Sequence, residues 1–395
     1  MFDGIEVDML NLGDADCILV TQWSPFGPQR VLVDGGNGDD APIVKEFLRA
    51  RNATFLYAVV CSHSHKDHAS GLVKLVEDKS ITICTGWMHD IRNHLSPATL
   101  RSASAGNSTR ADGVRQVIET TKELAAAFTS RQIMPVEPFA GASIAAFPEM
   151  TVVGPRLPYY QNLLKEVTDQ VRPATFPPVT MPPVSISDAM SKPIRLSALQ
   201  SPGFAGIAPV PPLYQNLSSM LAAIPSPPAL PTGFTFSSVL AGVLSDSSVK
   251  EAPKTQPFNN TSTILGVRSP GGQLLFTADA GSEALTHVPA CWNGLMWMQV
   301  PHHGSDGNLS QKDIERFRPR IANISACGDS SHPDRAIVSG LVKVGARVFS
   351  THQNGHLWFW SGAVPARPEY GSAVEMKGTG NPQPNYLKFL NGTNG

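Results

Sequence analysis

The sequence predicts an α/β fold that is interrupted by a long proline-rich insertion. Short apolar runs, typical of buried strands, alternate with stretches in which apolar residues recur at helical spacing. Between residues 55 and 85 the order is strand, helix, strand, which is typical of a β-α-β unit with parallel strands. Between Arg172 and Pro231 the chain has 14 prolines, little charge and no sustained periodicity, so we expect an extended or loop-rich segment there.

The individual elements can be placed in order along the chain. Three opening strands separated by turn residues predict an antiparallel sheet, and Pro42 lies near the start of the first helix. A loop rich in Ser, Ala, Asn and Gly is expected at 96–114. We expect strands at 5–10, 17–22, 29–34, 55–60, 81–85, 150–154, 263–267, 273–277, 297–300, 321–325 and 347–351, and helices at 41–51, 69–78, 91–95, 114–128, 157–167, 314–317 and 337–344.

These elements predict one main domain that the insertion divides. Its first part is 1–171, the insertion is 172–255 with short helices at 213–223 and 236–244, the second part is 256–365, and 366–395 is a C-terminal tail. The insertion could act as a lid, bind a protein partner, mediate homo-oligomerisation or serve as a spacer. The sequence alone leaves these roles open.

Composition limits the classes of function. A chain of 395 residues, 42% of them hydrophobic, can bury a large core, and its formal net charge of −1 gives no overall attraction for nucleic acid. Five scattered cysteines form no Cys-x-x-Cys pair, and Cys17, Cys61 and Cys84 lie in apolar runs, so we expect core packing in a reducing compartment. Without a signal-peptide pattern or an apolar run long enough to span a membrane, the expectation is a cytoplasmic protein with no membrane partner.

The most informative segment directly follows the strand expected at 55–60. His63, His65, Asp67 and His68 are four potential metal ligands, and the end of a strand in an α/β sheet is where ligands usually bind. His63 and His65 can bind one cation, while Asp67 and His68, beyond a tight turn, can bind a second. Solvated loop histidines are the alternative. Four potential ligands at this spacing behind a strand favour a two-metal site.

This motif, His-x-His-x-Asp-His, resembles the signature of the metallo-β-lactamase superfamily. Further segments are similar to its ComEC-like branch, the nuclease domains of bacterial DNA-uptake channels, over roughly two thirds of the chain. The resemblance implies an αββα sandwich, in which two mixed β-sheets are flanked by helices. The similar segments are Asn11-Leu-Gly-Asp-Ala-Asp16-Cys-Ile-Leu-Val, Val31-Leu-Val-Asp34-Gly-Gly, Asn259-Asn-Thr-Ser262-Thr-Ile-Leu, Leu274-Leu-Phe-Thr-Ala-Asp279, Val300-Pro-His302-His303-Gly-Ser305, His332-Pro333 and Phe349-Ser-Thr351-His-Gln-Asn-Gly355.

The later segments supply further candidate ligands. Asp279 follows a strand, and the resemblance implies that its carboxylate bridges two cations, although Ala278 stands where the branch usually has glycine. His302 and His303 follow another strand, and adjacent residues in extended backbone point to opposite sides. We expect His303 to be a ligand and His302 to contact phosphate or donate a proton, with their order left open.

His89 is a further candidate ligand. If the strand at 81–85 lies parallel to the strand at 55–60, it carries His89 to the same sheet edge. The chain has no histidine between His94 and His287, so either His89 replaces a later ligand that many superfamily members have, or the first cation has few ligands. A capping or surface role for His89 is equally open. Further residues expected to contact the substrate or support the ligands are Asp34, His332, His352 and His356.

These residues predict a hydrolase in which two divalent ions, Zn or Mn, activate a bridging hydroxide, with Asp67 and His302 as catalytic residues. The resemblance favours a phosphodiesterase or nuclease, with nucleic acid or another phosphodiester as substrate. The same centre could hydrolyse a lactone, a thioester or an amide. A metal-binding or partner-binding scaffold with a vestigial site is the alternative from a different class.

Overall fold

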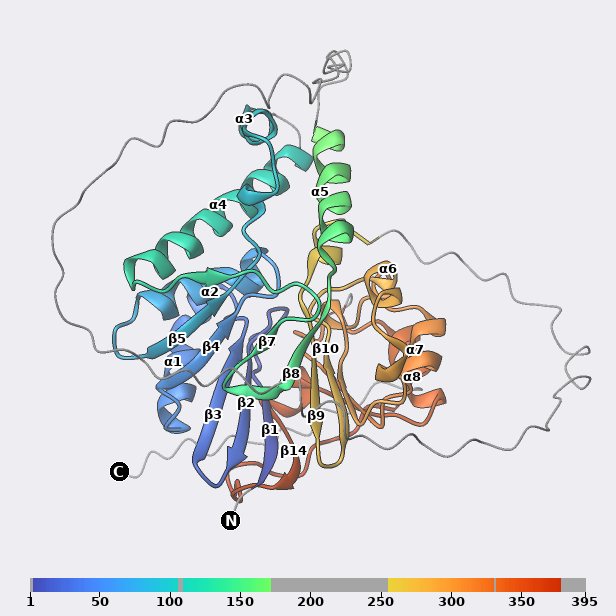
Figure 1. The fold of residues 1–395 in the computed structure, drawn as a ribbon. Coiled ribbons are helices and arrows are strands. Elements are labelled where there is room, and N and C mark those ends of the chain that lie inside the picture. The colour runs from blue at the N-terminus through green and yellow to red at the C-terminus, as the bar shows by residue number, and fades with distance from the viewer. Residues whose placement is uncertain (1–2, 106–108, 172–254, 330–331, 378–395) are drawn as a thin grey trace, which may run out of the picture. The chain divides into compact units, whose positions relative to one another are not determined.

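The computed structural model describes residues 3–105, 109–171, 255–329 and 332–377. Their strands form two mixed sheets of seven strands each, and helices lie along the outer faces of these sheets (Figure 1). The insertion predicted at 172–255, with its helices at 213–223 and 236–244, lies outside the described residues except for residue 255. The described chain has the predicted α/β class, in an arrangement consistent with a sandwich.

The first sheet joins the N-terminal strands to the last described strand. Its order is β14-β1-β2-β3-β4-β5-β6, antiparallel from β14 to β3 and parallel from β3 to β6, and Figure 1 shows β14 beside β1. The predicted antiparallel opening and the β-α-β unit are both confirmed. The sequence pattern does not predict β14. The strands are β1 (Asp3–Met9), β2 (Ile18–Ser24), β3 (Gly27–Val33), β4 (Phe55–Val60), β5 (Thr82–Trp87), β6 (Pro135–Val136) and β14 (Leu357–Ala363).

The second sheet has the order β13-β12-β11-β10-β9-β8-β7. It is antiparallel from β7 to β10 and parallel from β10 to β13, so each sheet has a parallel half that directs the C-terminal ends of its strands to one edge. The strands are β7 (Ser143–Ile144), β8 (Phe147–Gly154), β9 (Ile264–Ser269), β10 (Gly272–Phe276), β11 (Trp297–Gln299), β12 (Ile321–Ile324) and β13 (Arg347–Ser350).

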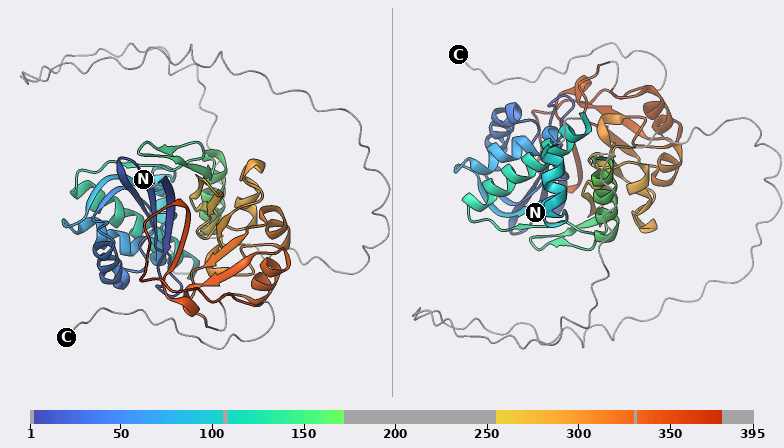
Figure 2. Two further views of the ribbon diagram at one scale, coloured as in Figure 1. Left: turned by 90° about the horizontal axis from the view of Figure 1, so that it is seen from below. Right: turned by 90° about the horizontal axis from the view of Figure 1, so that it is seen from above.

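Three buried apolar clusters fill the spaces between the layers of sheets and helices. Val7 and Phe359 of the first sheet belong to the same buried cluster as Leu274 and Trp297 of the second, so this cluster fills the space between the sheets. A second cluster packs the first sheet against α1 (Ala41–Ala50), α2 (Lys66–Glu77) and α4 (Thr109–Ser130). A third packs the second sheet against α6 (Ser282–Thr286), α7 (Gln311–Phe317) and α8 (Arg335–Lys343). Figure 2 shows from two further directions that helices lie on both outer faces.

Most predicted helices are present, with shifted boundaries. The segment expected as a helix at 91–95 is a short 3-10 turn, Ile91–Asn93. Among the described helices, none is long and apolar enough to cross a membrane. The helices are α1 (Ala41–Ala50), α2 (Lys66–Glu77), α3 (Pro97–Ala105), α4 (Thr109–Ser130), α5 (Leu157–Val171), α6 (Ser282–Thr286), α7 (Gln311–Phe317), α8 (Arg335–Lys343) and α9 (Thr351–Asn354).

Two expectations about local structure are wrong. The loop expected at 96–114 contains α3 and the start of α4, because Ala and Leu favour helix and Ser96 Oγ accepts a hydrogen bond from the Thr99 backbone N–H, as an N-cap does. The other concerns Cys84, which is exposed on β5 whereas Cys17 and Cys61 are buried as expected. Cys84 lies on the alternate, outward face of its strand.

Close backbone contact fixes α2 against the loop that follows β3. The Gly35 N–H donates to the His68 carbonyl at 2.9 Å, and the Gly71 N–H donates to the Gly36 carbonyl at 2.9 Å. A Cβ atom on Gly71 would lie 1.9 Å from the Gly35 carbonyl oxygen, so only glycine permits this approach. The contact holds the loop that carries Asp34 next to the first turn of α2.

The described part of the predicted C-terminal tail contacts both sheets. Arg367 donates to the buried Glu6 of β1, and the Tyr370 hydroxyl donates to Asp8 at 3.0 Å. Farther along, the Met376 N–H donates to the Val348 carbonyl of β13 at 2.8 Å. Residues 366–377 therefore contact β1 of the first sheet and the edge strand β13 of the second.

Candidate metal centre

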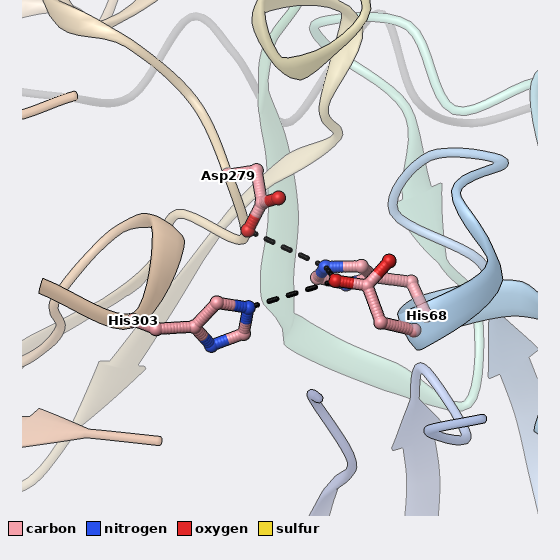
Figure 3. A group of neighbouring side chains, drawn as sticks. His68, Asp279 and His303 are labelled. Atoms are coloured by element: carbon pink, nitrogen blue, oxygen red, sulfur yellow. Dashed lines mark ion pairs between the residues drawn. The ribbon is translucent and has the colours of Figure 1, made fainter. Parts of the chain in front are cut away.

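The predicted ligands come together where parallel strands of both sheets end. Asp67 and His68 lie in the first turn of α2 after β4, Asp279 follows β10, and His303 follows β11. Helix α2 begins at Lys66, three residues before the predicted start, so these two ligands are helical and do not lie in a loop. Figure 3 shows the side chains of His68, Asp279 and His303 pointing toward one another from three separate elements.

One group of possible ligands consists of Asp67, His68, Asp279 and His303, whose ligand atoms all lie within 4.8 Å of one another. His68 Nε2 is 3.3 Å from Asp279 Oδ1 and 3.6 Å from Asp67 Oδ2, and His303 Nε2 is 3.6 Å from the same Asp67 oxygen. All but Asp67 are buried. Separations of this size suit several ligands around one cation.

A second group consists of His63, His65 and Asp279. His63 Nε2 lies 3.5 Å from Asp279 Oδ2 and 3.0 Å from His65 Nδ1. Asp279 therefore belongs to both groups, with Oδ1 facing His68 and Oδ2 facing His63. This places one carboxylate between the two pairs of ligands that the sequence motif predicts.

Neighbouring groups orient the imidazoles. His68 Nδ1 is 2.8 Å from Asp34 Oδ2, and His303 Nδ1 is 2.9 Å from the Ser325 carbonyl oxygen, so each ring can donate from Nδ1 and keep Nε2 as an acceptor. Ser62 donates its backbone N–H and its hydroxyl to Asp34, both at 2.7 Å. Asp34 therefore orients the His68 imidazole and is itself held by Ser62, as expected for a residue that supports a metal ligand.

Charge and burial act in opposite directions on the titratable groups. Burial disfavours a charged His68, but the carboxylates of Asp279, Asp67 and Asp34 outweigh it and raise the pKa of His68 well above its usual range. Burial also opposes the charged form of His303, yet the nearby carboxylates of Asp67, Asp16 and Asp279 raise its pKa to about 9.

The carboxylates respond in the complementary way. Although burial raises the pKa of Asp279, the nearby His68, His63 and His302 lower it well below its usual value. The pKa of Asp67 is likewise lowered by His68 and His303 against the effect of burial. Both carboxylates are therefore ionised at neutral pH, which is the form that binds cations.

The paired histidines do not have the extended backbone expected for them. They lie in a 3-10 turn, His302–Gly304, with φ of 48° at His302 and 56° at His303. His302 stands apart from the ligand groups: Nδ1 is 2.9 Å from Asn308 Oδ1, Nε2 is 3.8 Å from Asp279 Oδ2, and its side chain is 31% exposed. The left-handed turn, not strand alternation, separates the two imidazoles.

The remaining predicted histidines have diverse surroundings. His89 is buried between the rings of Phe139 and Tyr160, with centroid distances of 4.7 and 4.6 Å, and belongs to none of the ligand groups found among the described residues. His332 approaches the centre, with its ring 5.7 Å from that of His302. His352 and His356 lie elsewhere: His352 Nδ1 contacts Ser350 Oγ at 2.6 Å, and His356 Nδ1 accepts the Asn11 backbone N–H at 2.8 Å.

Several polar residues at the centre are absent from the predicted set. Asp16 is buried, its backbone N–H donates to the Asp67 carbonyl, and its Oδ2 accepts from Gln299 Nε2 at 2.7 Å. Gln299 Oε1 in turn accepts the backbone N–H groups of Thr277 and Ala278, which precede Asp279. Asp16 lies in one of the segments quoted for the family resemblance, so a signal was present, whereas nothing local marks Gln299.

The fold and the two ligand groups define an α/β protein with a candidate site for metal ions. No protein-family model matches the chain. A segment of 113 residues is 29% identical to ComE operon protein 3 of Bacillus subtilis (strain 168), and the match covers 28% of this chain and 15% of that protein. The chain is therefore weakly similar to a small part of this relative.

Proposed function

We propose that this chain has the metallo-β-lactamase fold and is a metal-dependent phosphodiesterase, with nucleic acid as the preferred substrate class. The observation that carries the proposal is the position of Asp279 between two groups of possible ligands, His63 with His65 on one side and His68 with Asp67 and His303 on the other. One carboxylate shared in this way is suited to two neighbouring cations.

The donor set fits divalent ions. His68 Nε2, Asp279 Oδ1 and His303 Nε2 are buried and have no hydrogen-bond partner, and leaving such atoms unsatisfied is costly. A cation at each ligand group would satisfy them. Imidazole nitrogens with carboxylate oxygens suit zinc, and manganese also accepts such ligands. His63, His65 and Asp279 would hold one ion, and Asp67, His68, Asp279 and His303 the other.

When bound, two such ions would lower the pKa of a shared water toward neutrality and stabilise charge that develops on the substrate. Residues of the chain would orient the metal ligands and contact the substrate. Asp34 and the Ser325 carbonyl hold the rings of His68 and His303 so that Nε2 faces inward. His302 is half-buried and its Nδ1 is occupied by Asn308, so Nε2 remains available to contact phosphate or to donate a proton to the leaving oxygen.

Charge supports a phosphodiester substrate. Two divalent cations bound by these ligand groups would attract the anionic oxygens of a phosphate. The resemblance of several segments to ComEC-like nuclease domains, and the similarity of one segment to ComE operon protein 3, point in the same direction. A neutral lactone or amide would gain less from this charge.

The experiment is hydrolysis by the full chain supplied with Mn²⁺ or Zn²⁺. Single-stranded DNA, duplex DNA, RNA and bis-p-nitrophenyl phosphate are offered beside a lactone and a carboxylic ester. We expect turnover of phosphodiesters, and its loss in Asp67→Ala and in Asp279→Ala. Asp306→Ala removes a carboxylate from an exposed residue in the loop after His303 and is expected to retain turnover. Turnover of the ester or lactone without any phosphodiester cleavage would contradict the proposal.

A further inference from the structure

The described residues contain four groups of possible ligands, and one of them shares no residue with the other three. Asp14 comes from the loop between β1 and β2, and Asp329 and His332 come from the segment after β12. Their ligand atoms all lie within 4.8 Å of one another, and His332 Nδ1 is 3.3 Å from Asp14 Oδ2. The group shares no residue with the others, so it can be tested separately.

Hydrogen bonds from Cys327 and from the backbone of His332 orient the two carboxylates of the group. The Cys327 backbone N–H donates to Asp14 Oδ1 at 2.8 Å, which leaves Oδ2 on the side of His332. The Cys327 thiol lies 3.1 Å from Oδ2 and adds a sulfur donor next to the group. The His332 backbone N–H donates to Asp329 Oδ1 at 3.0 Å. Such outer contacts commonly fix the ligands of metal sites.

The group borders the candidate metal centre on its solvent side. The ring of His332 lies 5.7 Å from that of His302 and 5.9 Å from that of His303. The side chains of Asp14 and His332 are 30% and 22% exposed, whereas His303 is buried. A cation here would be accessible to solvent and would lie beside the residues that face the substrate.

We propose that Asp14, Asp329 and His332 bind a third divalent cation at the rim of the metal centre. Two carboxylates and one imidazole give a mixed oxygen and nitrogen set that zinc accepts, and the two negative charges favour a dication over the hydrogen bond that otherwise joins His332 to Asp14. If the proposed function holds, this cation would contact a second phosphate of a polynucleotide next to the phosphate being cleaved.

The test is the number of zinc ions that the full chain binds. The metal-free protein is taken to equilibrium dialysis against increasing zinc, and the bound metal is counted at saturation for the wild type, the double variant Asp14→Asn with Asp329→Asn, and His332→Gln. We expect three ions in the wild type and two in each variant. Asp306→Asn removes one negative charge from an exposed residue in the loop after His303 and is expected to retain three.

The possible outcomes separate this site from the proposed function. Two ions in the wild type and two in every variant would overturn the third site while leaving the shared pair intact. One ion in the wild type that is lost in the double variant and in His332→Gln would support the rim site and contradict the pair. Circular dichroism of each variant confirms that a lost ion does not reflect unfolding.

Discussion

Asp34 and His68 form a buried pair in which the carboxylate Oδ2 lies 2.8 Å from the imidazole Nδ1. Both side chains are essentially inaccessible to solvent. The other carboxylate oxygen accepts the Ser62 backbone N–H, so Asp34 is itself held in place. The pair therefore selects the tautomer in which His68 Nε2 is free to face Asp279 and Asp67.

We predict that Asp34→Asn weakens metal binding without removing a ligand. An amide nitrogen in place of one carboxylate oxygen would face the Ser62 N–H or the His68 Nδ1–H, and one of these hydrogen bonds would be lost. Loss of such an outer contact typically lowers metal affinity about 10- to 100-fold. Competition with a chromogenic chelator measures the change. Asp39→Asn alters an exposed carboxylate nearby and should bind as the wild type does; equal affinities in both variants would argue against the orienting role.

Much of the site could be predicted because its signals are local. A strand followed directly by ligand residues marks His63, His65, Asp67 and His68, and the same signal after β10 and β11 marks Asp279 and His303. Since parallel strands end at a common edge, these separate segments can be expected to meet. The shared position of Asp279 was implied by the family resemblance alone.

What could not be predicted depends on contacts between distant segments. Gln299 reaches Asp16, 283 positions away, and nothing near Gln299 in the sequence indicates this partner. His302 and His303 lie in a left-handed turn just after a strand. The alternation of side chains along a strand therefore does not apply to them. The position of His89 between Phe139 and Tyr160 likewise requires α5 to pack near β5.

We predict that His302→Ala and His303→Ala both lose turnover but differ in the amount of metal that they bind. His303 Nε2 belongs to a ligand group and is buried without a partner, so its loss should reduce both bound metal and turnover. His302 belongs to none of the groups among the described residues, so its loss should leave metal content unchanged and lower kcat about 100- to 10,000-fold, as for a general acid. Metal analysis and phosphodiester turnover of the same samples separate the two roles.

A loss of metal from His302→Ala would show that His302 is a ligand. Because Nε2 lies 3.8 Å from Asp279 Oδ2, the ion it would bind is the one held by His63 and His65. If both variants lose turnover but keep their full metal content, His303 is not a metal ligand.

We predict that His89 makes the fold sensitive to acid. Burial, with a smaller effect of His94, lowers the pKa of His89 from 6.5 to about 3, and neither ring nitrogen has a hydrogen-bond partner. Below pH 6.5 the unfolded chain binds a proton that the folded chain does not, so stability falls as pH drops toward 3. At pH 5 this loss is about 2 kcal/mol relative to pH 7.5.

His89→Phe removes the proton site and keeps an aromatic ring between Phe139 and Tyr160. We measure the free energy of unfolding in urea at pH 7.5 and at pH 5. The decrease between the two should be smaller in the variant than in the wild type, by about 2 kcal/mol. An unchanged pH dependence would mean that His89 is not the responsible group. Loss of bound metal in this variant would indicate that His89 is a metal ligand.

The final prediction concerns the segment that bridges the sheets. Glu6 is fully buried and accepts hydrogen bonds from Arg367 Nε and Nη2 and from Trp358 Nε1, the last at 3.0 Å. Arg367→Met removes the cation that is hydrogen-bonded to this carboxylate, and breaking a buried ion pair typically costs about 3–5 kcal/mol. The double variant Glu6→Gln with Arg367→Met should recover part of the loss, because the unpaired carboxylate is then replaced by a neutral amide. Urea unfolding measures both.

The matched control is Arg347→Met, because Arg347 pairs with Glu375 at 3.0 Å on the surface, where both side chains are well exposed. Water and salt screen such a pair, so its loss should cost less than about 1 kcal/mol. A similar cost for Arg367→Met would indicate that Glu6 is solvated and that residues 366–377 contribute little to stability. A large cost limited to Arg367→Met would instead show that residues 366–377 stabilise the fold through the buried Glu6.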